Sequence, residues 1–383
     1  MGGRVISTLR CSCLIASCIG DSLPRPQDPL SGNQRRLLSA IAEAKIVPET
    51  LQMGEAAVDF WAGSRWFNGK PKLVVVGHRG CGKNKITALE AADSRPSIME
   101  NTITSFNMAA ANGADFVEFD VQVTKDGHAV IFHDDLLITD DSVERAIGDM
   151  TLHEFLSIGF QRDGHQGGKS LLRRASDGAL RKWTVSVDDS LCTLKQAFEE
   201  VHPFTGFNIE VKFHDVLPTS DQELERVIGA ILSEVEQYAG GRRIYFSSFH
   251  PDAVGLLRKK QSRYPVFFLT DGGVQLYNDP RRNSIEAAIQ VCKTSNLQGI
   301  VSEVKAVLNN PSAVAQVKQA GLSFLTYGEL NNMAEALHKQ EEDGVDGVIV
   351  DHVTEMVTAA RKMDKVATAS SGVDSSPAVR VVA

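Results

Sequence analysis

The sequence has no long hydrophobic run, no excess of basic residues and no paired set of cysteines. No apolar stretch reaches the roughly 18–20 residues that a membrane-spanning helix needs, so we expect no transmembrane segment. The 40 Lys and Arg residues are outnumbered by 48 Asp and Glu, and the net charge of -8 argues against a nucleic-acid partner. Three of the six cysteines lie within the first 18 residues, and the others are far apart: Cys81, Cys192 and Cys292. This spacing is not a disulfide framework and favours a reducing compartment.

What the chain does contain is typical of a globular α/β protein, with 43% hydrophobic and 23% charged residues. Its length suggests two or more domains of about 150 residues, although an α/β barrel can run to about 250 residues as one domain. The predicted parallel strands are Leu73–Gly77, Phe116–Val121, Phe207–Val211, Arg243–Ser247, Val266–Thr270, Gly299–Ser302, Ser323–Thr326 and Gly347–Asp351. The predicted helices between them include Asn101–Asn112, Leu191–Val201, Gln222–Tyr238 and Asn332–Glu342. Eight such strands predict a closed (β/α)8 TIM barrel.

A further β-type run, His128–His133, comes too soon after the second barrel strand to be parallel to it. Only four residues, Thr124 to Gly127, separate it from Val123, whereas a parallel crossover needs a dozen or more. We therefore expect an antiparallel hairpin. The chain then continues for some seventy residues before the next barrel strand, which predicts an inserted hairpin-plus-loop segment at about 134–203, over the barrel mouth. Long segments of this kind usually line functional sites.

The two ends of the chain differ from the predicted barrel at 72–360. Residues 1–40 hold five Arg, no Lys and only two acidic residues, a composition typical of an organellar transit peptide. A disordered cytoplasmic tail is the alternative. Residues 41–71 are predicted to form a helical extension, and 361–383 a disordered tail of small and polar residues.

Charged and titrating side chains gather at the ends of the predicted strands. They are His78 and Arg79, Glu118 and Asp120, His133, and Glu210 and Lys212. The carboxyl ends of barrel strands meet at one face, where the active sites of these barrels lie. The pattern therefore predicts one site built from several strands.

Glu118 and Asp120 lie two positions apart on a strand, so both side chains face the same side. On a barrel strand that side is the interior, where two unpaired carboxylates are costly. A cation resolves the cost, and Glu210 can add a third oxygen. This set, without Cys or His, suits Mg2+ or Ca2+. The alternative is that the carboxylates pair with Arg79 and Lys212 in a structural ion network. If the carboxylates bind a metal ion instead, Arg79 and Lys212 would bind a substrate phosphate.

His78 and His133 are the candidates for acid–base catalysis. The reference pKa of His, about 6.5, suits both proton removal and proton donation near neutral pH. Neighbouring carboxylates would orient the two rings. We expect Glu100 to hydrogen-bond His78 or, with Asn101, to support the metal-binding carboxylates.

Five short motifs carry a family resemblance. They are His-Arg-Gly at 78–80, Glu-Asn-Thr at 100–102, Glu-x-Asp at 118–120, His-Asp at 133–134 after the turn Asp126-Gly127, and Glu-x-Lys at 210–212. Together they resemble the glycerophosphodiester phosphodiesterase family over roughly 72–359. The sequence motifs RGCG at 79–82, FSSFHPDA and LTYGELNN resemble those of the short, plastid-type plant branch of this family. Tyr327 stands where many members carry Trp, a difference that concerns the leaving-group pocket.

The resemblance implies hydrolysis of glycerophosphodiesters, such as glycerophosphocholine or glycerophosphoethanolamine, to sn-glycerol 3-phosphate and an alcohol. It assigns Glu118, Asp120 and Glu210 to a divalent cation, with Mg2+ the first expectation and Ca2+ the second, and makes His78 and His133 catalytic. Which His is the base stays open, as does the choice between direct attack by water and a cyclic phosphate intermediate. It also favours a plastid over a cytoplasmic location.

Two other functions compete with this one. A phospholipase D- or C-like barrel would act on intact phospholipids, but the predicted loops hold basic residues without an aromatic cluster. A binding barrel that had lost its chemistry would lack one of the two His or a carboxylate, and all of them are present.

Overall fold

The computed structural model of the chain describes part of its length. The described residues are 66–67, 70–71, 73–86, 97–141, 143–158, 170–175, 177–214 and 218–371. The transit peptide or tail predicted for 1–40, and nearly all of the predicted helical extension, lie outside these ranges. Among the described residues, no helix combines the length and hydropathy needed to cross a bilayer.

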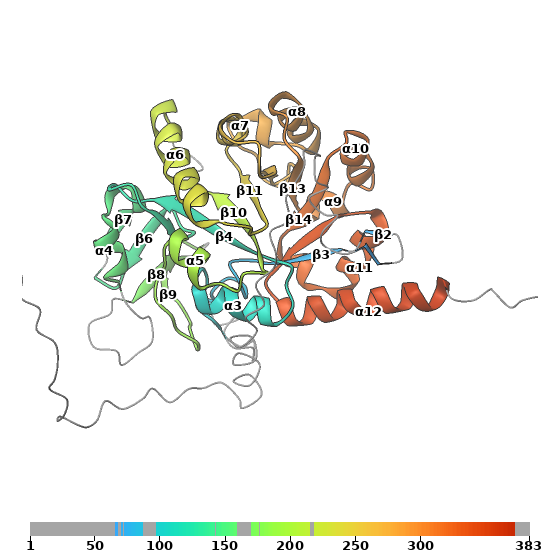
Figure 1. Cartoon of the computed structure of the whole chain (residues 1–383), viewed down its shortest axis with the longest axis horizontal. Helices are drawn as coiled ribbons and strands as arrows, with labels where there is room; N and C mark the ends of the chain where they lie inside the picture. The colour runs from blue at the N-terminus through green and yellow to red at the C-terminus, as the bar shows by residue number, and fades with distance from the viewer. Residues whose placement is uncertain are drawn as a thin grey trace, which may run out of the picture. The chain divides into compact units, whose positions relative to one another are not determined.

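Eight parallel strands form a closed barrel (Figure 1), as the sequence predicts. The strands are β3 (Val74–Gly77), β4 (Phe116–Val123), β10 (Gly206–Val211), β11 (Ile244–Ser248), β12 (Val266–Thr270), β13 (Gly299–Glu303), β14 (Ser323–Tyr327) and β15 (Gly347–Val350). They pair in chain order, β15 pairs with β3, and the pairing of β10 with β4 completes the ring. The predicted α/β fold with a TIM barrel is therefore confirmed.

Helices connect the strands and pack on the outside of the barrel. They are α3 (Ile103–Ala111), α5 (Leu194–Glu200), α6 (Asp221–Tyr238), α7 (Pro251–Lys260), α8 (Ile285–Ser295), α9 (Val304–Leu308), α10 (Ala313–Gln319), α11 (Ala334–Asp343) and α12 (Val353–Ser371), with short 3-10 turns η2 (Pro280–Arg282) and η3 (Glu329–Asn332). The hydroxyl of Ser220 caps α6 by accepting from the backbone N–H of Glu223. Leu224, Val227 and Ile231 of α6 face the barrel at helical spacing.

The alternation of side chains along each strand divides the core into two layers. On β4, Val117 and Phe119 pack against the helices, whereas Phe116 points into the barrel. The inner layer contains Phe116 together with Val74, Val76, Tyr245, Phe267, Leu269, Val301, Leu325 and Ile349. Because successive side chains point to opposite faces, Glu118 and Asp120 share the inner face with Phe116. They stand above the apolar layer, toward the carboxyl end of the strand.

The predicted insertion after the second barrel strand is present and contains a sheet of its own. It starts with β5 (Ala129–Ile131), which pairs antiparallel with β4 as predicted. Its other elements are β6 (Leu136–Thr139), β7 (Glu144–Ala146), η1 (Ile147–Asp149), α4 (Leu152–Leu156), β8 (Leu171–Arg174) and β9 (Leu180–Lys182). The antiparallel order is β7-β6-β8-β9, over a separate apolar cluster that includes Phe132, Phe155 and Trp183. This part of the chain therefore has a packed core rather than only loops.

The end of the predicted helical extension differs from expectation. Two short strands, β1 (Trp66–Phe67) and β2 (Lys70–Pro71), pair antiparallel there. The helix prediction for 41–71 is therefore wrong over these residues. The intervening sequence Asn-Gly is a strong signal for a two-residue hairpin turn, which explains the difference.

The predicted disordered tail at 361–383 is wrong for its first part, because α12 continues to Ser371. The buried side chains of Met356 and Val357 fix the start of this helix on the barrel. Arg, Lys, Met and Ala, all good helix formers, then carry it onward. Residues 372–383 lie outside the described part of the chain.

The barrel interior makes Gly299 intolerant of a side chain. A Cβ atom there would lie 2.2 Å from a ring carbon of Phe267 and 2.7 Å from the backbone oxygen of Ser323. We expect Gly299→Ala to lower the free energy of unfolding in urea by about 1–3 kcal/mol. Gly229, in the exposed part of α6, has nothing within 4 Å, so Gly229→Ala should instead raise it by about 0.4–1 kcal/mol. Equal unfolding midpoints for the two variants would contradict this packing.

Candidate active site

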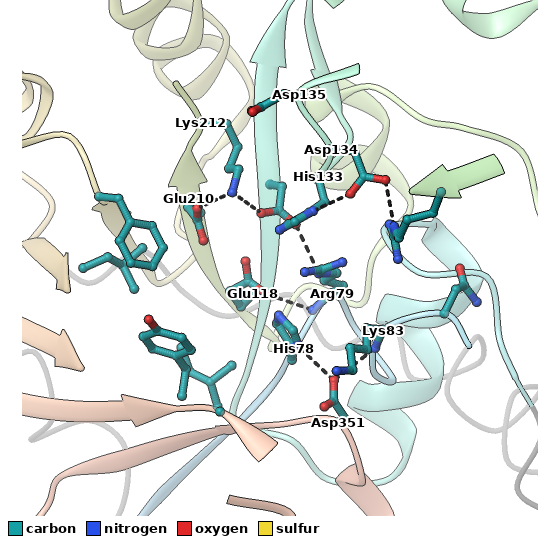
Figure 2. Close-up of a pocket in the computed structure, with 18 of the residues that line it drawn as sticks. His78, Arg79, Lys83, Glu118, His133, Asp134, Asp135, Glu210, Lys212 and Asp351 are labelled. Carbon is teal, nitrogen blue, oxygen red and sulfur yellow. Dashed lines mark hydrogen bonds and ion pairs between the residues drawn. The ribbon is translucent and has the colours of Figure 1, made fainter. Parts of the chain in front are cut away.

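A cavity of about 790 Å³ opens at the carboxyl ends of the barrel strands (Figure 2). Its lining includes seven of the nine residues that the sequence singles out: His78, Arg79, Glu118, Asp120, His133, Glu210 and Lys212. Residues of the insertion, among them Asp134 and Arg173, line it as well. The remaining two predicted residues, Glu100 and Asn101, are buried next to it and contact its lining directly.

Three buried carboxylates lie together in this cavity. Glu210 on β10 stands in register with Asp120 on β4, and oxygen atoms of Glu118, Asp120 and Glu210 all lie within 4.8 Å of one another. Asn101 donates a hydrogen bond of 2.9 Å from its amide to Asp120 Oδ2. Burial, followed by the charges of Asp120 and Glu210, raises the pKa of Glu118 well above its usual range. The three groups thus repel one another at a site where they are largely buried.

Two cations partly offset this repulsion, but among the described residues their side chains form ion pairs with Asp120 and Glu210 and not with Glu118. Lys212 Nζ lies 3.0 Å from Glu210 Oε1 and 3.7 Å from Asp120 Oδ1, and Arg79 Nε lies 3.7 Å from Asp120 Oδ2. Glu118 receives only the backbone N–H of Arg79, at 2.8 Å on Oε2. Its other oxygen is buried without a hydrogen-bond partner among the described residues. The structural ion network considered from the sequence is therefore incomplete, and the three carboxylates fit a divalent cation.

Each of the two histidines is held by one carboxylate. His78, at the end of β3, shares a contact of 2.7 Å between Nδ1 and Asp351 Oδ1, and His133 shares one of 2.7 Å between Nδ1 and Asp134 Oδ1. A hydrogen bond at Nδ1 leaves Nε2 as the nitrogen that can exchange a proton. Burial, then the charges of Arg79 and Lys212, lowers the pKa of His133 to about 4. The ring of His133 is thus neutral at pH 7 and able to accept a proton.

Glu100 does not take the first of the two roles expected for it, a hydrogen bond to His78. The ring of His78 is held by Asp351. Instead its carboxylate accepts from Arg79 Nη1 at 2.9 Å and from two nitrogens of Arg173, at 2.7 and 3.0 Å. Burial alone would raise the pKa of Glu100, but Arg173 and Arg79 hold it well below its usual range. A buried carboxylate between two guanidinium groups is better compensated than one beside an imidazole, which explains the correction.

With this geometry in view, the sequence was compared with known proteins. The sequence model of the glycerophosphoryl diester phosphodiesterase family matches residues 78–355. The chain belongs to this family. Glycerophosphodiester phosphodiesterase GDPD1, chloroplastic, of Arabidopsis thaliana is 50% identical over 298 residues, which are 77% of this chain and 82% of the relative. Glycerophosphodiester phosphodiesterase GDPD2 of the same plant is 49% identical, over 76% of this chain and 79% of the relative.

Solved structures of glycerophosphodiester phosphodiesterases share the fold. One is the Oleispira antarctica phosphodiesterase in complex with the product sn-glycerol-3-phosphate, with a TM-score of 0.53 and 20% identity over 76% of this chain and 97% of that structure. Another is the enzyme of Thermotoga maritima, with a TM-score of 0.51 and 23% identity over 75% of this chain and 97% of that structure. At this identity the likeness supports the barrel and its helices.

The wall of the cavity opposite the insertion is aromatic in this glycerophosphodiester phosphodiesterase. The rings of Phe249 and Tyr327 meet edge to face with their centroids 5.9 Å apart, and Leu269 also lines this side. The hydroxyl of Tyr327 donates a hydrogen bond to Asp271. Tyr327, which stands where many members carry Trp, is thus tied to a carboxylate at the rim. Both sides of the cavity are mixed, since Asp271 and Glu329 lie near the aromatic rings and the insertion adds Leu136 and Ile138 beside its charged residues.

Two residues that support the site, Asp351 and Arg173, were not singled out from the sequence, and Asp134 was named only as part of the His-Asp motif. Asp351 follows β15 directly, so the rule that selected the other strand ends could have found it. Asp134 is adjacent to His133 in the sequence. The structure is needed to show that it is the carboxylate that contacts the His133 ring. Arg173 gave no signal, because it lies on β8 of the insertion and nothing in the sequence fixes how that sheet meets the barrel.

Proposed function

We propose that this protein hydrolyses glycerophosphodiesters, such as glycerophosphocholine and glycerophosphoethanolamine, to sn-glycerol 3-phosphate and an alcohol. The observation that carries the proposal is the meeting of two carboxylate-held histidines with three buried carboxylates in one cavity. The names of the Arabidopsis relatives and the product bound to the Oleispira enzyme support it.

In this proposal Glu118, Asp120 and Glu210 hold a divalent cation, with Mg2+ expected before Ca2+ because all the ligands are oxygens. The cation would act as a Lewis acid toward a phosphoryl oxygen. Arg79 and Lys212 face the same cavity and would stabilise negative charge as it builds on the phosphate. Arg79 is suited to this, because it lines the cavity next to Asp120.

The two histidines would move the protons. One takes the proton of the nucleophile and the other gives one to the oxygen of the leaving alcohol. The nucleophile is either water or the 2-hydroxyl of the glycerol moiety, which would give a cyclic phosphate that water then opens.

The first test is release of sn-glycerol 3-phosphate from several diesters, with intact phosphatidylcholine as the comparison for a phospholipase. Chelation should abolish release, and Mg2+ or Ca2+ should restore it. Asp120→Ala should lower the rate by more than about 100-fold, because it removes a metal ligand. Asp343→Ala is a matched control, since Asp343 pairs with Lys339 at the end of α11. Full activity in enzyme shown to be metal-free by elemental analysis would contradict the metal role.

The second test concerns His78 and His133. His78→Ala and His133→Ala should each lower kcat by about 100- to 10,000-fold, because each removes one proton-transfer group. Substrate binding should weaken much less. His338→Ala, on the exposed face of α11, serves as the control. A kcat near the wild-type value in either active-site variant, at saturating substrate, would show that the paired acid–base assignment is wrong.

We also propose that the protein acts in plastids, where released glycerol 3-phosphate could enter lipid synthesis. The chloroplastic relative and the Arg-rich, acid-poor composition of residues 1–40 support this location. Residues 1–40 fused to a fluorescent protein should carry it into plastids, whereas the same segment with its five Arg replaced by Gln should not. A chain starting at Ser39 should keep full activity in vitro. Diffuse cytosolic fluorescence from the unaltered fusion would contradict the plastid location alone.

A further inference from the structure

We propose that Arg173 of the insertion is a positioning residue, which sets the orientation of His133 through Asp134 and holds Glu100 so that Arg79 stays available to the substrate. The inference rests on the proposed function. It is argued from three sets of contacts around Arg173.

The first is its hydrogen bonds, which use all three guanidinium nitrogens. Nε donates to Asp134 Oδ2 at 2.7 Å, while Nη1 and Nη2 donate to the two oxygens of Glu100 at 3.0 and 2.7 Å. Asp134 uses its other oxygen to hold His133 Nδ1 at 2.7 Å. One planar fork therefore connects a candidate acid–base group with a buried carboxylate of the barrel. A point charge such as Lys could not make these contacts together.

The second is an aromatic support that fixes the plane of the fork. The Arg173 guanidinium carbon lies 4.5 Å above the centroid of the Trp183 ring. That ring is stacked on Phe132, with centroids 6.2 Å apart and planes 9° apart. Phe132 directly precedes His133 in the chain. The core of the insertion thus fixes the position of the His133 backbone and of the group that orients its side chain.

The third set of contacts is made by the carboxylate of Glu100, which Arg173 and Arg79 share. Arg173 donates to both oxygens of Glu100, while Arg79 makes one hydrogen bond to Oε1 and directs its Nε toward Asp120 Oδ2, at 3.7 Å. Without Arg173, the buried carboxylate of Glu100 would be left with Arg79 and with the backbone N–H of Asn84, which donates to Oε2 at 2.6 Å. We expect Arg79 to turn further toward Glu100, and the Asp134–His133 pair to lose its fixed geometry. Both changes reduce stabilisation of the transition state.

A merely structural role for Arg173, as a fastening between the insertion and the barrel, makes a different prediction. It would lower the melting temperature but leave kcat per folded molecule unchanged. The comparison therefore needs a variant that removes a salt bridge from the same sheet without touching the site. Arg181 on β9 is the cross-strand partner of Arg173 and pairs with Asp177 at 2.5 Å.

We expect Arg173→Ala to lower kcat for glycerophosphocholine by about 10- to 100-fold, the usual loss for a residue that orients active-site ligands. KM should change by less than about threefold, because the guanidinium nitrogens of Arg173 are already engaged by Asp134 and Glu100. The Mg2+ concentration for half-activation should stay at the wild-type value, since Arg173 bonds none of the three metal-binding carboxylates. Guanidinium ion at non-denaturing concentration should restore several-fold activity to Arg173→Ala and none to Arg181→Ala, by filling the space between Glu100 and Asp134.

If Arg173→Ala does not fold, Arg173→Lys gives the same test, since it keeps the charge and the packing on Trp183 but loses the fork. Its kcat should fall while its melting temperature stays near that of Arg181→Ala. Equal kcat values for the Arg173 and Arg181 variants, or a loss that guanidinium does not reverse in folded Arg173→Ala, would overturn the inference. A wild-type enzyme inactive on every diester would refute the proposed function instead, so the two failures are distinguishable.

Discussion

The site is governed by the cost of burying three carboxylates in the interior of a barrel. Glu118, Asp120 and Glu210 are almost fully enclosed, and their oxygens lie within 4.8 Å of one another. Buried negative charges are tolerated only when cations or hydrogen-bond donors compensate them. Lys212 and Arg79 supply part of this compensation. The repulsion that these cations do not compensate raises the pKa of Glu118, and it is the physical reason to propose a bound metal ion.

The fold explains how these groups come to lie together. Parallel pairing of β4 with β10 places Asp120 beside Glu210, and the two-residue period of a strand places Glu118 on the same inner face as Asp120. The apolar layer that contains Phe116 and Tyr245 fills the barrel below them. Charge is thus confined to the open end of the barrel, where a substrate can reach it. The insertion then adds Asp134 and Arg173 from the side.

Much of this arrangement is predictable from the sequence, because apolar runs that end in charged residues mark both the barrel strands and its mouth. The eight strands and the hairpin after β4 follow from that pattern. The contact between Glu100 and Arg173 does not follow from that pattern. The position of Arg173 is fixed by its packing on Trp183 inside the insertion. Such a contact depends on how two separate cores meet. Local periodicity carries no information about that meeting. The helical start of the predicted tail was missed for a related reason, since α12 is anchored by buried Met356 and Val357, which precede the tail, and the helix then continues into it.

The two histidines consequently depend on different parts of the molecule. Asp351, which holds His78, comes from the barrel strand β15, so this pair forms whenever the ring of strands closes. Asp134, which holds His133, is bonded to Arg173 of the insertion. A closed barrel therefore assembles the three buried carboxylates and one histidine, but not the second histidine in its observed orientation. The proposed mechanism needs both histidines at once, so it makes correct docking of the small sheet a condition for activity rather than only for stability.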